Sequence, residues 1–327
     1  GTLTDVLKGL SAKALLGYDF KYNQDESFRK EYYQYAWDEK TQSYDSQVYN
    51  ESTPNNLTRA SYNQQQTLAQ FILSYDRTFD EKHKVGALIG YEMQKHNADN
   101  YYASGDLAFG TPYFTSLSGN NQLVGIDKGS FYEVMYQALI GRLNYSYADR
   151  YLLEAQFRYD GSSKFAPGHQ WGFFPSVSAG WRISEEPFFK DSALSFINQL
   201  KIRASYGVLG DDNSMNYEWI SGYTFRGGET AGDGKGWHQG YAPGYMFNGN
   251  FVYSVDPSSL PNQNITWLRS TTFNIGADFE AWRGKLGASF DYFQRIRRGI
   301  FSRNSVGLPT IVGASAPYEN LDSDSHL

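Results

Sequence analysis

The chain has 327 residues and a formal net charge of −6, so its charge does not suggest nucleic acid as a partner. It contains no cysteine, which excludes disulfide bonds and thiolate metal sites. Aromatic residues make up 17% of the chain although its mean hydropathy is −0.57, and no apolar run is long enough to predict a transmembrane helix.

Alternating apolar and polar residues predict strands along most of the chain. In chain order, the predicted strands cover residues 12–22, 61–79, 84–96, 131–147, 150–162, 171–184, 200–208, 271–282 and 285–296. Tight connections at residues 79–84, 148–149 and 283–284 alternate with long ones at residues 23–60, 97–130 and 209–270. This alternation predicts an antiparallel up-and-down meander, with the short turns at one rim and the long loops at the other.

An insert at residues 185–199 lies on the short-turn side of this meander. The segment "EEPFFKDSALSFINQL" predicts one short helix that begins near Asp191 or Ser192. Leu194, Ile197 and Leu200 follow at spacings of three, which is typical of an apolar helix face. We expect this helix beneath the rim of a barrel.

The two faces of each strand differ in chemistry. Between residues 171 and 183 one face carries aromatic and aliphatic side chains and the other carries Gly, Ser and Arg. A soluble β-sandwich alternates in the same way. Three features favour a membrane barrel: strands well above the usual 5–6 residues, loops far above the usual length, and a polar face with both charge signs.

Three blocks of sequence resemble a known family. They are "NYSYADRYLLEAQFRYDGSSKFAPGHQWGFFPSVSAGWRISEEPFF", then "INQLKIRASYGVLGDDN", then "NITWLRSTTFNIGADFEAWRGKLGASFDYFQR". In this order and at this spacing they resemble the SusC/RagA family of TonB-linked outer-membrane transporters. The resemblance is close over residues 144–296, whereas residues 12–104 match only through their strand and turn pattern.

The resemblance implies a transmembrane barrel of 22 strands filled by a plug, of which this chain would supply about nine strands. All of residues 1–327 would belong to the barrel domain, and the plug domain, the TonB box and the C-terminal strands would lie outside the chain. The family implies a nutrient importer in the bacterial outer membrane, not an enzyme, and no cofactor. Oligosaccharides or peptides would be taken up beneath a SusD-like surface lipoprotein, with energy from the TonB complex.

The strand pattern assigns side chains to the lumen and to the membrane interface. We expect Arg142, Glu154, Arg158, Asp160, Arg182 and Arg203 on the lumen wall. There the arginines would pair with the plug, or with Glu154 and Asp160. Aromatics near strand ends are typical of an interfacial girdle, and the candidates are Tyr147, Tyr151, Trp171, Trp181 and Tyr292.

The long loop at residues 211–263 is rich in aromatic residues and glycine. Aromatic faces suit stacking on sugar rings, so we expect Trp219, Trp237, Tyr241 and Tyr245 to contact the substrate. The alternative is that these aromatics pack the loop on itself or against a partner protein, as in tyrosine-rich interfaces.

The polar motifs are weaker signals. "DGSSKF" at residues 160–165 predicts a structural turn, and "GDDN" at residues 210–213 is by default a turn, with a hard cation as the alternative. The histidines show no metal-binding spacing and no nucleophile elbow is present, so we predict no catalytic and no metal site. Two rival functions remain open: a porin-like or adhesin barrel without TonB coupling, and a soluble β-rich carbohydrate-binding or hydrolytic protein.

Overall fold

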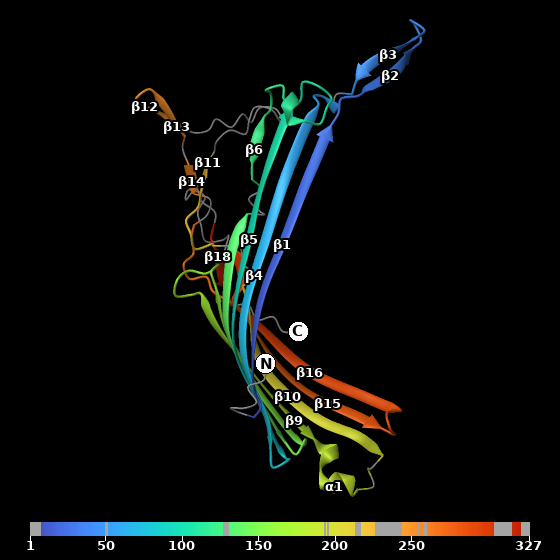
Figure 1. Ribbon diagram of the computed structural model, residues 1–327, viewed down its shortest axis with the longest axis vertical. Coiled ribbons are helices and arrows are strands. Elements are labelled where there is room, and N and C mark those ends of the chain that lie inside the picture. Colours follow the sequence, from blue (N-terminus) through green and yellow to red (C-terminus); the bar gives the residue numbers. More distant parts are fainter. Residues whose placement is uncertain are drawn as a thin grey trace.

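The computed structural model describes residues 8–49, 52–126, 131–192, 194, 196–212, 217–225, 244–253, 255–257, 260–303 and 316–321. Over these ranges the chain is almost entirely antiparallel β-structure, with long strands side by side in one curved sheet (Figure 1). Among them, no helix combines the length and the apolar character needed to cross a membrane.

The main sheet follows the chain. Its strand order is β1-β4-β5-β7-β8-β9-β10-β15-β16, and the short strand β6 (Leu123–Gly125) pairs with β5 outside this path. The long strands are β1 (Leu10–Arg29), β4 (Asn56–Phe79), β5 (His83–Asp106), β7 (Tyr132–Tyr147), β8 (Tyr151–Ser162), β9 (Trp171–Arg182), β10 (Ile197–Asp211), β15 (Leu268–Ala281) and β16 (Leu286–Arg298). Each predicted strand is present, and every neighbouring pair is antiparallel, as the meander requires.

Smaller elements lie in the connections between the long strands and after β16. Four two-stranded ribbons form from β2 (Tyr33–Asp38) with β3 (Ser43–Val48), β11 (Tyr223–Phe225) with β14 (Val255–Pro257), β12 (Gly244–Phe247) with β13 (Asn250–Tyr253), and β17 (Ile300–Arg303) with β18 (Tyr318–Leu321). Short 3-10 helices cover Phe114–Ser116 and Ile183–Glu185, and the α-helix α1 covers Pro187–Lys190.

The tight turns share one backbone geometry. The turns β4–β5, β7–β8 and β15–β16 each place two consecutive non-glycine residues in the left-handed region, with φ between 47° and 57°. Consecutive left-handed residues match the right-handed twist of the flanking strands, so the strands can fold back directly. These turns gather at the end of the sheet opposite the β2–β3 ribbon (Figure 1).

Strands β1, β4 and β5 are longer than the sequence pattern predicts, because the apolar alternation stops before the hydrogen-bond ladder does. The halves of these strands toward the long loops carry polar side chains that contact one another across strands, as in the Arg59–Glu26 ion pair at 2.7 Å and the Thr58–Ser104 hydrogen bond at 2.8 Å. The loops predicted at residues 23–60 and 97–130 are correspondingly shorter. The first of them contains the β2–β3 ribbon.

The predicted start of the short helix was wrong. The helix lies in the expected insert, but it begins at Pro187 and ends at Lys190, with Asp191 just after its last turn. Proline is favoured at the first helical position because the amide it lacks would be unpaired there. Ile197 and Leu200 belong to strand β10, so their spacing of three does not reflect a helix.

A buried aromatic cluster lies near the long-loop end of the sheet. Phe165, Phe174, Ile265 and Trp267 form it, and Val208, Phe301 and Tyr318 pack against it. Phe165, the last residue of the DGSSKF motif, is fully buried. Within the motif, Ser163 bonds in both directions with the Met135 backbone, at 3.0 and 2.9 Å. The motif therefore ties the turn after β8 to strand β7.

Candidate functional site

One face of the sheet is a polar wall that runs across the strands. Each residue of a pair on adjacent strands is itself paired with a residue on the next strand. A single row of paired residues, here called a rung, can therefore be followed across the sheet from β4 to β15. This rung consists of Asp76, Gly86, Asn144, Glu154, Ser178, Ser205 and Asn274. It carries no apolar side chain.

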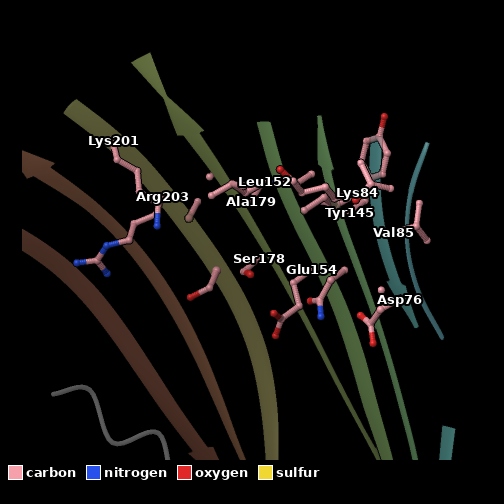
Figure 2. Close-up of a pocket in the computed structure, with 18 of the residues that line it drawn as sticks. Asp76, Lys84, Val85, Tyr145, Leu152, Glu154, Ser178, Ala179, Lys201 and Arg203 are labelled. Atoms are coloured by element: carbon pink, nitrogen blue, oxygen red, sulfur yellow. The ribbon is translucent and has the colours of Figure 1, made fainter. Parts of the chain in front are cut away.

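The polar wall is the concave face. Residues of the same seven strands line one hollow of about 800 Å³ (Figure 2). On a flat sheet seven strands would span about 29 Å at about 4.8 Å per strand, so they share a hollow only if the sheet curves toward this face. Asp76, Glu154 and Lys201 reach it from strands far apart in sequence.

The charges of this wall are paired with one another. Arg142 donates to Glu154 at 2.7 Å, and the Asn144 amide can bridge the two, donating to Glu154 and accepting from Arg142. Arg158 donates to Asp160 at 2.9 Å and lies 3.7 Å from Glu92. Glu154 and Asp160 thus each pair with an arginine of this wall.

Arg203 joins two carboxylates on the neighbouring strands. Its guanidinium contacts Asp278 at 3.1 Å and Asp291 at 2.7 Å. In register, Arg203 faces Gly276, and Gly276 faces Asp291 on the next strand. A Cβ at Gly276 would lie 2.6 Å from Asp291 Oδ1 and 2.9 Å from Arg203 Cζ, so the glycine leaves the space through which the arginine reaches across a strand.

A buried carboxylate fastens the short-turn rim. Glu186 accepts from Arg150 at 2.8 Å and from the Trp181 indole at 3.0 Å. Hydrogen bonds from the Tyr151 hydroxyl, Arg150 and Trp181 lower the pKa of Glu186 to about 2. Arg182, the last residue of β9, lies at the same rim, 3.4 Å from Glu185.

A second, smaller hollow lies on the same face toward the long-loop end. Its volume is about 360 Å³, and its lining includes Glu92, Tyr136, Arg158, Asp212 and Trp267. Asp212 accepts from Ser162 at 2.8 Å and lies 3.6 Å from Lys164, so this residue of the GDDN motif is engaged by protein side chains. In the described ranges no group of three or more potential metal ligands gathers.

The opposite, convex face is apolar and exposed. One of its rungs consists of Tyr75, Ala87, Leu143, Ala155, Val177, Tyr206 and Phe273. Neighbouring residues show the contrast between the faces, since Phe173 is 50% exposed and Phe174 is 6% exposed. A soluble sheet would leave this continuous apolar area in water, which argues against the soluble alternative.

The height of this apolar face fits a bilayer. On β9 it runs from Trp171 to Trp181, about 33 Å along the strand at about 3.3 Å per residue. At a strand tilt of about 40° this corresponds to about 25 Å, the usual height of the apolar band of an outer-membrane barrel.

Four of the five predicted interface aromatics lie at the two ends of this band. Tyr151 stacks between Tyr147, at 6.3 Å, and Trp181, at 6.4 Å, beside the short turns. Trp171 stacks on Tyr159 at 4.9 Å at the other end. Tyr292 lies near the middle of β16 and does not join either group.

The substrate-contact candidates are only partly described. Trp219 lies in the turn at residues 217–220, and its indole N–H is buried with no partner among the described residues. Tyr217 fixes this turn by donating to the Glu133 carbonyl. Trp237 and Tyr241 lie outside the described residues, as does the side chain of Tyr245 on β12.

Sequence reasoning missed the β2–β3 ribbon. Its signal was present in the alternation Tyr33, Tyr35, Trp37, followed after a turn by Tyr44. Because this alternating run is short and lies inside a polar stretch, the sequence pattern predicted a loop there.

Comparison with known proteins identifies the family. Residues 5–325 match the family model described as TonB dependent receptor-like, beta-barrel. Over 76% of its length the chain is 30% identical to TonB-dependent receptor P39 of Formosa agariphila, of which it spans 22%. Over 52% of its length it is 34% identical to TonB-dependent receptor SusC of Bacteroides thetaiotaomicron, of which it spans 15%.

A solved structure of the RagAB peptide transporter shares the fold. It superposes with a TM-score of 0.73 over 96% of this chain and 31% of that one, at 22% sequence identity. The comparisons confirm the resemblance to SusC and RagA, the antiparallel barrel fold and the location in the bacterial outer membrane. The chain belongs to the family of TonB-dependent receptor-like β-barrels.

Proposed function

We propose that this chain forms part of the barrel wall of a TonB-dependent outer-membrane importer for oligosaccharides or peptides. The observation that carries the proposal is the two-faced sheet: an apolar convex face of bilayer height and a concave face whose charges are paired with one another, within and across strands. Arg142, Glu154, Arg158, Asp160 and Arg203 would then line the lumen, and Arg182 would lie at its inner rim.

The remaining strands, a plug and a TonB box would come from other parts of the protein. Among the described residues the outer edges of β1 and β16 have no partner strand. Unpaired backbone edges are not tolerated in lipid, so further strands must close the barrel. The relatives, several times longer than this chain, support the same view.

The family suggests the substrate class and a lid. The name of the RagAB structure specifies a peptide transporter. The resemblance to the SusC/RagA family implies a SusD-like surface lipoprotein as partner. We place a lipoprotein of this kind at the long-loop end, since barrels carry their long loops on the external side. Trp219, Trp237, Tyr241 and Tyr245 remain the proposed substrate contacts at that end.

Uptake by cells with the full-length protein tests the proposal. Labelled oligosaccharides and labelled peptides are offered in parallel, with and without an uncoupler that abolishes the proton-motive force. An importer coupled to TonB loses uptake of its substrate class when the membrane is de-energised. Uptake that persists unchanged under the uncoupler would instead show a passive, porin-like channel.

A further inference from the structure

Strands β9 and β10 separate halfway across the apolar band, a separation here called the split. β9 pairs with β8 from Trp171 to Trp181, but its pairing with β10 ends at Ser176 and Gly207. Beyond Gly207, β10 continues to pair with β15 up to Asp211. Residues 171–175 of β9 therefore have no partner on the β10 side among the described residues, although they lie inside the sheet.

A proline stands at the point where the split begins. Pro175 is the first residue of β9 beyond the last pair with β10. Proline has no amide hydrogen to donate, so within sheets it is confined to edges, strand starts and bulges. The position is suitable for proline because no β10 residue is paired with it. The sequence thus agrees with the separation of the two strands.

The concave side of the split is filled by protein. Phe174 of β9 belongs to the buried aromatic cluster, and Val208 of β10 packs against the same cluster. A Cβ at Gly210 of β10 would collide with the Phe174 ring, so this glycine lets the ring reach across the split. Side-chain packing therefore joins the two strands on this side, where they have no paired residues.

The convex side of the split carries a groove of about 310 Å³. Three aromatic rings and three smaller apolar side chains line it, from Phe157, Phe173, Tyr206, Ala155, Pro175 and Val177. The other two lining residues, Gln156 and Ser176, form a pair whose side chains alternation directs to the concave face, so they contribute backbone. The groove thus belongs to the apolar, convex surface.

The lining favours hydrocarbon. It contains no charged residue, and the Tyr206 hydroxyl is the one polar group among the side chains that face the groove. A sugar or a peptide placed there would lose hydrogen bonds to water without replacement. The volume lies at the lower end of the usual range of ligand sites, about 300–1,000 Å³, which suits one chain rather than a whole lipid.

The depth of the groove identifies the source of the hydrocarbon. Pro175 and Val177 lie halfway between Trp171 and Trp181, the two ends of the apolar band. At this depth a bilayer presents lipid tails. An empty groove would leave its lining without neighbouring atoms on one side, and a chain that fills the groove restores these dispersion contacts.

We propose that this groove binds one acyl chain of a membrane lipid, which fills the wall where β9 and β10 separate. The inference rests on the proposed function in one respect, since the convex face must meet lipid. It adds a site at which one lipid is held, whereas lipids around the rest of the face exchange freely. A ligand that binds only the folded protein stabilises it, so the stability of the protein should depend on this chain.

The experiment maps lipid contacts of the full-length protein in phosphatidylcholine vesicles. A phosphatidylcholine with a photoreactive diazirine near the end of one acyl chain is included, and labelled residues are found by mass spectrometry. Residues 139–143 of β7 lie at the same depth as residues 173–177, because both stretches pair with residues 155–159 of β8. We expect about threefold or more label at 173–177 than at 139–143.

Two alanine substitutions test whether the groove causes this difference. Ala155→Trp fills the groove, and Ala277→Trp places the same ring on the convex face of β15, outside the groove. Ala155→Trp should reduce the label at 173–177 to the level at 139–143, and Ala277→Trp should leave it unchanged. In detergent, added phosphatidylcholine should raise the unfolding temperature of wild type and of Ala277→Trp but not of Ala155→Trp.

Folding of each variant is checked by heat-modifiable migration on gels. If Ala155→Trp does not assemble, Val177→Phe narrows the same groove from β9 and takes its place. The label distribution on wild type decides the question without any variant.

The outcomes separate this inference from the proposed function. Equal label at 173–177 and 139–143 would overturn the groove, while the lipid facing of the convex side would stand. No label at either stretch would mean that the convex face does not meet lipid, and the proposed function would fail together with this inference. Crosslinks from 173–177 to a second copy of the protein would make the groove a contact between barrels and would also overturn the inference.

Discussion

At the scale of single residues, the polar wall is stabilised by side chains that reach across strands. Arg203 spans Gly276 to reach Asp291, and Glu186 collects three donors from the short-turn rim. The Arg203–Asp291 contact depends on the small residue Gly276, and the Glu186 contacts depend on the positions of its three donors. The alternation of apolar and polar residues in the sequence does not reveal either requirement. The sequence could predict that lumen arginines pair with Glu154 and Asp160, because Arg142 and Glu154 lie on adjacent strands and Arg158 and Asp160 lie two residues apart on the same face of β8.

Glu186 predicts a pH dependence. Its pKa falls from the ordinary 4.5 to about 2 in the folded protein, so the carboxylate stabilises the fold at pH values above about 4.5 and loses this contribution as the pH falls toward 2. We expect Glu186→Gln to lower the unfolding temperature of the detergent-solubilised protein at pH 7. The gap between variant and wild type should narrow below pH 4.5. A gap that is constant from pH 7 to pH 3 would contradict this.

Truncation of Phe165 should measure how much the buried cluster contributes to the free energy of unfolding. Its side chain is fully buried against Trp267, so Phe165→Ala should reduce the free energy of unfolding by about 3–5 kcal/mol. Phe109→Ala serves as the control, because Phe109 is exposed at the long-loop end. Urea unfolding of the full-length protein in lipid vesicles measures both, and equal losses would mean that the cluster is not a core.

At the scale of elements, strand positions followed from period-two alternation, and strand ends did not. The nine long strands were all predictable because a lipid-facing side demands an apolar residue at every second place. That demand ends at the membrane surface. The sequence pattern therefore predicted loops for the β2–β3 ribbon and for those halves of β1, β4 and β5 that lie toward the long-loop end. The helix was misplaced because Ile197 and Leu200 show a spacing of three within a strand that contains a register shift.

Adjacent residues of strand β9 should differ in how well they tolerate substitution by arginine. Val177 lies near the middle of the apolar band, so Val177→Arg should destabilise the folded barrel by about 2–4 kcal/mol in lipid. Ser178 lies on the polar wall opposite Glu154 in register, so Ser178→Arg should cost far less. Folding titrations into vesicles compare the two. A larger loss for Ser178→Arg would reverse the facing of the sheet.

At the scale of the whole molecule, the sheet is a curved wall, and under the proposed function further strands would close it. β1 and β16 carry its outer edges among the described residues, and both strands bear exposed apolar side chains. We expect residues 1–327 expressed alone to form no heat-resistant, membrane-inserted species, whereas the full-length protein does. Recovery of a folded, inserted segment would show that this wall closes on itself or on copies of itself.

We expect the convex face of the sheet to meet lipid and its concave face to meet water. Since residues 1–327 contain no cysteine, single cysteines can be placed at residues 153 to 158 of β8 in a full-length protein freed of other cysteines. An aqueous maleimide should label positions 154, 156 and 158, and a lipid-phase maleimide positions 153, 155 and 157. Labelling of position 158 from the lipid phase, or the loss of any alternation, would contradict the account.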